Sequence, residues 1–201
     1  MTLTPPFVSD GAGHYELADP VILVDADGNA ITVNGSVGAL VTVDAIHRQI
    51  HIGRLFEAGH YATGIANAGT VDILIVTAIN SPHVRFQIGA SGAATAQLYE
   101  DVSASANGTA VSSFNRNRNS ANTVTTTLFH TPTITNTGTA LMLEYLPGGE
   151  ASGNRTVGST LPTFEEWILK PATKYLVRIT NVSGSAISAA ANFAFYEIDA
   201  A

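Results

Sequence analysis

The sequence predicts an all-β fold, a sandwich or a barrel, and three observations lead to this prediction. Roughly ten short runs rich in Val, Ile, Thr, Phe and Tyr follow one another, and turn residues separate them about every 8–12 residues. No stretch shows the hydrophobic period of a long helix. Hydrophobic residues make up 45% of the chain, a share that argues against a disordered polypeptide.

Composition and charge narrow the functions that the chain can have. Charged residues make up 12% of the 201 residues, against about 25% in an average protein. The net charge of −7 argues against a general nucleic-acid-binding protein, which needs a positively charged surface. The chain has no cysteine, so its fold uses no disulfide. We see no secretory signal at the N-terminus and no apolar stretch approaching ~20 residues, so we expect no membrane association.

The first 44 residues are expected to form an extended arm and a small hairpin. Residues 1–20 are rich in Pro, Gly and Asp and show no periodicity, which is typical of an arm. Two short apolar runs, Val21–Val24 and Ala30–Val33, flank an Asp-Gly turn and predict a hairpin. The turn resembles the start of a calcium-binding loop, but Ser36 stands where the closing Glu would be, so we expect no metal there. We place a domain boundary near residue 44 and a sandwich domain over 45–201.

The sandwich domain is expected to begin with a strand over Ala45–Ile52, whose isoleucines share one parity. His47 and His51 would lie about 13 Å apart on such a strand, too far to bind one metal. The most continuous apolar run, Val71–Ile79, predicts a strand that is buried on both faces for much of its length. Further strands are predicted at Gly59–Ile65, His83–Ala90, Ala94–Glu100, Ala140–Leu146, Lys174–Asn181 and Ala186–Ile198, and Phe164–Leu169 is either a strand or a short helical turn.

The chain is organised around the stretch Ala110–His130. Asn and Arg alternate at its centre, ahead of a Thr-rich predicted strand over Thr123–Phe129. On extended backbone the alternation would place the arginines on one face and the amides on the other. The guanidinium groups could then pair with carboxylates or carbonyls of another subunit, and the amides with neighbouring backbone. We therefore expect a subunit interface formed by Asn115, Arg116, Asn117, Arg118 and Asn119, with a solvated loop as the alternative.

The same stretch carries a resemblance to a known family. FNRNRNS, the preceding LYEDVSASANGT (Leu98–Thr109) and the following TVTTTLFHTPTITNTGT (Thr123–Thr139) together resemble a family of tailed-phage virion proteins. The resemblance extends over roughly Ala45–Ile198 and implies a β-sandwich, in particular a jelly roll, that decorates or cements the capsid shell. It implies location on the capsid surface of the virion, after synthesis in the host cytoplasm. The implied partners are the major capsid protein and further copies of this chain, which we expect to form a homotrimer, as jelly-roll decoration proteins do.

The sequence contains none of the motifs that identify a nucleophile elbow, a zinc protease, a P-loop or a dinucleotide site. Glu165 and Glu166 would point to opposite faces of a strand, so they cannot easily flank one bond as paired catalytic carboxylates do. His60 and His130 border apolar strands and are expected to have structural roles. We therefore expect no catalytic residue, no metal ligand and no cofactor.

Three aromatic residues are candidates for a ligand or interface anchor, namely Trp167, Phe164 and Tyr145. Our leading hypothesis is a non-enzymatic structural protein of a phage capsid. The alternative is a tail- or fibre-associated module that binds a receptor or a carbohydrate through Trp167, Tyr145 and the long loop Pro147–Leu161. An enzyme would need a pocket of clustered His, Tyr, Arg or carboxylate side chains, which the spacing of these residues does not show.

Overall fold

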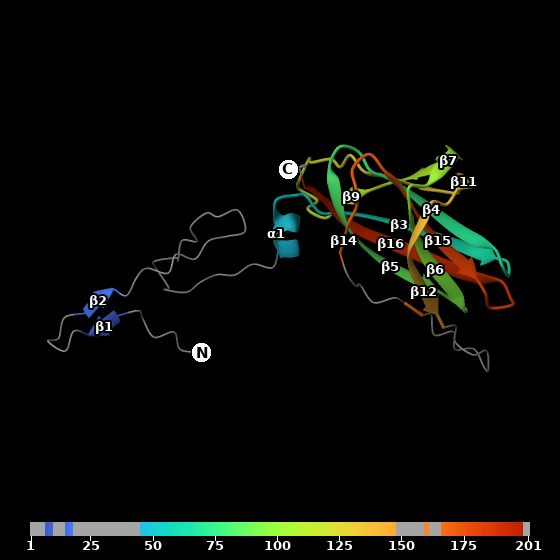
Figure 1. The fold of residues 1–201 in the computed structure, drawn as a ribbon, viewed down its shortest axis with the longest axis horizontal. Coiled ribbons are helices and arrows are strands. Elements are labelled where there is room, and N and C mark those ends of the chain that lie inside the picture. The colour runs from blue at the N-terminus through green and yellow to red at the C-terminus, as the bar shows by residue number, and fades with distance from the viewer. Residues whose placement is uncertain (1–6, 10–14, 18–44, 148–158, 161–165, 199–201) are drawn as a thin grey trace. The chain divides into compact units, whose positions relative to one another are not determined.

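The computed structural model of the chain describes residues 7–9, 15–17, 45–147, 159–160 and 166–198 (Figure 1). The chain divides into two compact units, Met1–Val43 and Asp44–Ala201. In the first unit, β1 (Phe7–Ser9) and β2 (Tyr15–Leu17) pair as an antiparallel hairpin, within the stretch that was expected to be an extended arm. The hairpin predicted around the Asp-Gly turn, at 21–33, lies outside the described residues.

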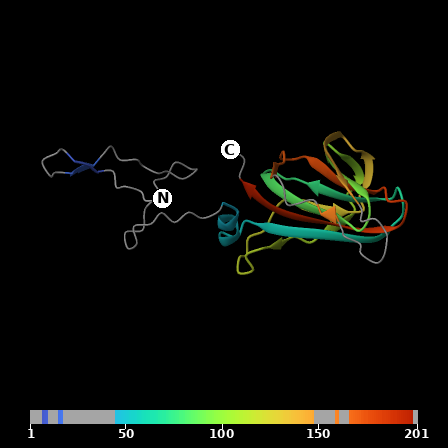
Figure 2. The same ribbon diagram turned by 90° about the horizontal axis from the view of Figure 1, so that it is seen from below.

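The second unit is a sandwich of antiparallel sheets, so the all-β prediction is confirmed (Figures 1 and 2). The first sheet contains, in spatial order, β12 (Thr139–Leu146), β6 (Ala94–Glu100), β15 (Lys174–Asn181), β4 (Thr70–Val76), β10 (Thr127–His130) and β8 (Thr109–Val111). The second contains β13 (Ser159–Thr160), β5 (Ser81–Ala90), β16 (Ile187–Ile198), β3 (Phe56–Ile65) and β9 (Phe114–Asn115), with β14 (Trp167–Ile168) also paired to β5. A separate ribbon consists of β7 (Ser103–Ala106) and β11 (Thr133–Asn136).

The strand pairs are nested, so the domain is one long hairpin rolled into two sheets. β3 pairs with β16, β4 with β15, β5 with both β13 and β14, and β6 with β12. The nesting continues inward through β7 with β11 and β8 with β10. Because the outer strands alternate between the two sheets along the chain, this winding is that of a jelly roll. The tip of the rolled hairpin is the segment 112–126, which contains the Asn/Arg stretch and forms β9 against β3.

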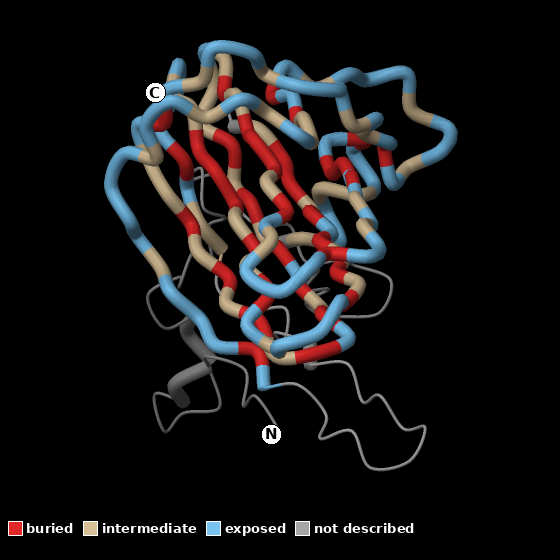
Figure 3. Tube along the Cα trace, turned by 90° about the vertical axis from the view of Figure 1, so that its right-hand side faces the viewer, coloured by how far each residue is buried: buried red, intermediate tan, exposed pale blue. Residues whose placement is uncertain are grey.

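The main core lies between the two sheets and is filled by alternate residues of each strand. On β5, Val84, Phe86 and Ile88 are buried, and the residues between them are partly or fully exposed, as the alternation predicts. Phe193 and Phe195 of β16 lie in the same core. Figure 3 shows the buried segments running along the inner strands of the domain. Burial of each such large side chain stabilises the fold by about 1.5–3 kcal/mol relative to exposure.

A second, small apolar cluster explains why β4 is buried on both faces. Ile73 and Ile75 face the main core, whereas Leu74 packs in a separate cluster with Val102 and Leu176. Ile134 of β11 also packs there, so the β7–β11 ribbon covers this part of the first sheet. The prediction of a strand buried on both faces is therefore confirmed.

The prediction of a strand over Ala45–Ile52 is wrong, because Ala45–His51 forms a short helix, α1. Ile46, Gln49 and Ile50 are partly buried, while the residues between them are exposed, a spacing that also fits a helical period. The helix ends at His51, and Gly53, two residues further on, has a positive φ of 70°, which is typical of the residues that follow a helix C-terminus. No helix among the described residues is long and apolar enough to cross a membrane.

Replacing Phe193, which is 1% exposed, by Ala should lower the free energy of unfolding by about 3–5 kcal/mol, because the sheets cannot close over the cavity left between them. Urea denaturation measures this loss. Tyr61→Ala is the matched control, since Tyr61 on β3 is 65% exposed and its removal should cost little. Equal losses in the two variants would contradict the placement of the core between the sheets.

Candidate functional site

The loop at the tip of the hairpin is anchored by its asparagines to the junction of α1 and β3. Asn115 is buried, and its Nδ2 donates hydrogen bonds to the carbonyl oxygens of Gly53 (2.8 Å) and Asn122 (3.3 Å). Nδ2 of Asn117 donates to the carbonyl oxygen of His51 at 3.0 Å. The amides thus bind neighbouring backbone, as the sequence indicated.

Local hydrogen bonds also set the shape of this loop. Oδ1 of Asn115 accepts from the backbone N–H of Asn117 (2.9 Å), and Oδ1 of Asn117 accepts from that of Asn119 (3.1 Å). Such contacts replace the ladder of a strand, and residues 116–119 form bends and a turn where an extended backbone was expected. The N–H of Arg116 donates to the carbonyl oxygen of Leu55 at 2.9 Å, which ties the loop to the start of β3.

The two arginines of the loop are exposed. The side chain of Arg116 is 45% exposed, and its Nε lies 3.6 Å from Oε2 of Glu57. The guanidinium carbon of Arg118 lies 5.8 Å from the centre of the Phe114 ring, within the range of a cation–π interaction. An exposed ion pair contributes about 0–1 kcal/mol, so these side chains contribute little to the stability of the fold.

Both arginines line a shallow groove of about 440 Å³ beside β3 and β16. The Phe114 ring in this groove is 58% exposed. Gly59 has no side chain, which leaves room for the side chain of Asn192. Any other residue at position 59 would place its Cβ 2.5 Å from Oδ1 of Asn192. The groove therefore presents an aromatic ring and two guanidinium groups together with the carboxylate of Glu57, a combination suited to binding another protein surface or a polar ligand.

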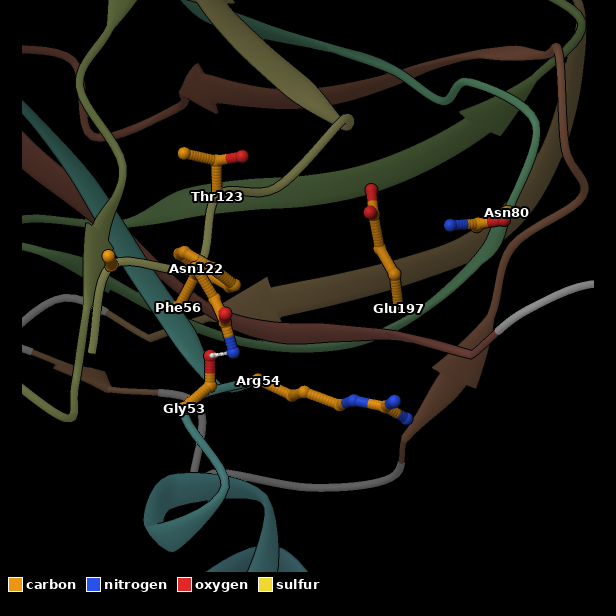
Figure 4. A pocket seen from close by; sticks show the side chains of 8 residues that line it. Gly53, Arg54, Phe56, Asn80, Asn122, Thr123 and Glu197 are labelled. Carbon is orange, nitrogen blue, oxygen red and sulfur yellow. Dashed lines mark hydrogen bonds between the residues drawn. The ribbon is translucent and has the colours of Figure 1, made fainter.

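A second hollow, of about 480 Å³, adjoins the same loop (Figure 4). Its wall contains the hydrogen bond from Asn122 to Gly53, drawn as a dashed line. Glu197 also lines it, but the carboxylate accepts hydrogen bonds from the backbone N–H groups of Thr125 and Thr126. Burial raises the pKa of Glu197, yet these hydrogen bonds lower it overall, so the group is ionised at neutral pH. Glu197 therefore holds the backbone of residues 125–126, which explains why the Thr-rich strand starts only at Thr127.

A cluster of ionisable side chains that the sequence did not reveal surrounds a small cavity of about 90 Å³. Oε1 of Glu166 lies 2.6 Å from Nδ1 of His83 and accepts a hydrogen bond from the Tyr196 hydroxyl at 2.7 Å. Oε2 of Glu166 lies 3.3 Å from Nε of Arg85. His83 and Tyr196 meet because they are register partners on β5 and β16. Only that register, which the sequence does not specify, could have identified the cluster.

His83, Glu166 and Tyr196, here called the clamp, join β5 and β16 to the residue that precedes β14. Burial raises the pKa of Glu166, but the hydrogen bonds from His83 and Tyr196 lower it overall, so its carboxylate is ionised at neutral pH. Burial and the hydrogen bond to Glu166 raise the pKa of Tyr196, which stays a phenol. The neutral phenol donates to Oε1 of Glu166, and Oε2 faces Nε of Arg85, so both carboxylate oxygens have donors. The contacts hold the start of β14 against β5 and β16.

Two histidine pairs lie outside this cluster in the part of the chain that the structure describes. His47 and His51, predicted to be far apart on a strand, are neighbours on α1, with 2.8 Å between their Nε2 atoms. His60 on β3 stacks on His130 of β10, with ring centres 4.2 Å apart, so this pair links the two sheets. Among the described residues, no three His, Cys, Asp or Glu side chains gather as a metal site would require.

Of the three aromatic candidates, the two that the structure describes, Trp167 and Tyr145, lie in different sheets. Trp167 is partly buried, packs on the main core and lies opposite Val84 of β5. Tyr145 is 60% exposed on β12, in the other sheet. Phe164 lies outside the described residues. Trp167 thus packs partly against the core, whereas Tyr145 is exposed at the surface.

Stability should fall in two steps as the pH is lowered. Burial and the charge of His130 lower the pKa of His60 from its ordinary value of 6.5. As the pH falls below about 6.5, His60 therefore becomes protonated in the unfolded chain before it does in the folded chain, and the free energy of unfolding decreases. The lowered pKa values of Glu100, Glu166 and Glu197 give stability that is present above 4.5 and lost as the pH falls through their folded-state values. Melting temperatures from pH 8 to pH 3 measure both steps. The His60→Gln variant should lose the first step and keep the second, and a wild-type curve that is flat between pH 7 and pH 5.5 would contradict this account.

Glu166→Gln should lower the free energy of unfolding by about 1.5–3 kcal/mol, because it removes a charged acceptor that faces three donors. Tyr196→Phe, which removes one of these donors, should cost about 1 kcal/mol. Asp101→Asn, at an exposed carboxylate, is the matched control and should change little. If Glu166→Gln matched this control, the clamp would contribute nothing to the fold.

Searches with protein-family models, among curated proteins and among solved structures found no match to this chain.

Proposed function

We propose that the chain is a non-enzymatic structural protein of a phage virion that decorates or cements the capsid shell through contacts between subunits. The observation that carries the proposal is the anchored Asn/Arg loop, which presents Arg116 and Arg118 beside the exposed ring of Phe114. Arg and aromatic side chains are the residues most enriched at the energetic centres of interfaces. Because the asparagines fix the loop beforehand, a partner would not have to order it, and less conformational entropy is lost on binding.

The low charge of the chain supports the same proposal. Charged residues are depleted from the buried centres of interfaces, and this chain has 12% of them. The assignment to a capsid comes from the resemblance of the FNRNRNS stretch to phage virion proteins. The proposed partners are the major capsid protein and further copies of the chain, as a homotrimer. On a symmetric shell many weak contacts act together, so no single contact has to be strong.

A receptor- or carbohydrate-binding role at the phage tail is the second candidate. The observation that favours it is the groove itself, where the exposed ring of Phe114 lies near Asn192 and Glu57, since rings stack on sugars and polar groups bind their hydroxyls. Glycan binding that is lost in Phe114→Ala, without any affinity for capsid shells, would favour this candidate over the first.

Replacing Arg116 and Arg118 together by Ala should weaken binding to capsid shells stripped of this protein at least tenfold. The melting temperature should change little, because neither guanidinium group is buried. Co-sedimentation with the shells measures the binding. Arg48→Ala combined with Arg54→Ala, two other exposed arginines, is the control with the same change in net charge. Equal loss of binding in both double variants would reduce the effect to general electrostatics, and a matching loss of stability would show that the loop arginines serve the fold.

A further inference from the structure

The strands at the edges of the two sheets differ in length. β8, β9, β13 and β14 have only two or three residues each, whereas β12, which ends the first sheet, has eight. Unpaired N–H and C=O groups of an edge strand attract a further strand, and proteins block this with short edges, Pro or Lys. β12 contains neither Pro nor Lys, and its only charge is Glu144. Among the strands that end a sheet in the part of the chain that the structure describes, β12 is the longest. The edge of β3 beyond Glu57 is also unpaired on one side, but β3 does not end its sheet.

The side chains of β12 that face away from the core are apolar and exposed. Leu143 is 65% exposed and Tyr145 60%, opposite Gln97 and Thr95 of β6. Leu141, at the bulge near the start of the strand, is 37% exposed. The edge therefore combines unpaired N–H and C=O groups with a line of exposed apolar side chains. A strand that carries a similar line of apolar side chains would pair with this backbone and cover these side chains.

We propose that β12 pairs in antiparallel fashion with β12 of a second copy of this chain. The strand is self-complementary about Leu143. With a two-fold axis there, Leu143 faces the partner's Leu143 and Leu141 faces the partner's Tyr145. The same register sets Glu144 opposite the partner's Met142. An axis at Glu144 would instead oppose two carboxylates, which destabilises a strand pair.

This pairing would join two six-stranded sheets into one continuous sheet. The pairing of β12 rests on the proposed function, because it specifies one of the contacts between copies of the chain that this function requires. A two-fold contact uses the same patch on both copies and closes after two of them. Any trimer must therefore be formed by other surfaces, among which the Asn/Arg loop is the one already described.

Because the chain has no cysteine, single-cysteine variants test the register directly. Leu143→Cys should form a disulfide-linked dimer under mild oxidation, because opposed Cβ atoms in such a pair lie about 4.5–5.5 Å apart. A mixture of Leu141→Cys and Tyr145→Cys should cross-link more than either variant alone. Ile79→Cys, at a site that is 75% exposed in the turn between β4 and β5, is the control. Cross-linking of Leu143→Cys no faster than this control would overturn the pairing.

The mass of the assembly, measured by light scattering, gives a second test. Leu143→Lys places two ammonium groups at the axis and should halve the mass, whereas Ile79→Lys should leave it unchanged, with circular dichroism confirming that both variants are folded. An unchanged mass in folded Leu143→Lys, or a monomeric wild type, would overturn the pairing. Binding to stripped shells is measured separately, so a chain that binds shells without pairing through β12 refutes only the pairing. A chain that pairs but binds no shell refutes only the capsid role.

Discussion

The whole domain depends on nested pairing between strands that are far apart in the chain. The outermost pair joins β3 to β16, so Phe56 and Phe195 lie opposite each other although most of the domain separates them in sequence. In the folded domain each inner pair lies between the two halves of the chain, which run side by side in one register. Because a shift of one residue would turn the apolar face of a strand toward water, the alternation of buried and exposed side chains maintains that register. The high sequence separation of these contacts also implies slow folding.

The loop at the tip owes its position to this winding. Once the hairpin is rolled, its tip returns to the first strand of the domain, where β9 pairs with β3 and the asparagines bind the backbone after α1. Amides serve well here because each offers both donors and an acceptor, so one side chain can satisfy several backbone groups. The arginines are then left to face outward. The position of the tip therefore explains why the asparagines of the loop bind backbone while its arginines are exposed.

The sequence predicted those features that depend on local pattern. The alternating burial of β5 and the burial of β4 on both faces could be predicted, because the apolar and polar residues of each strand follow one pattern along the sequence. The helix α1 was missed because Ile46 and Ile50 fit two periods, and only contacts with the rest of the domain decide between them. The clamp of His83, Glu166 and Tyr196 was missed for a different reason. Its members come from three strands or their ends, and no spacing along the chain encodes which strands become neighbours.

The nesting of the strands has a topological consequence. Since β3 begins beside the last residues of β16, the first and last strands of the jelly roll start and end at the same end of one sheet (Figure 1). The fold needs its set of strand pairs, not the order in which a ribosome supplies them. A circular permutant whose ends are joined there, and which is reopened at the exposed turn around Asn67, would keep every pair and the same register. The strand pairs of the domain thus form a closed set in which the first and last strands, β3 and β16, are neighbours.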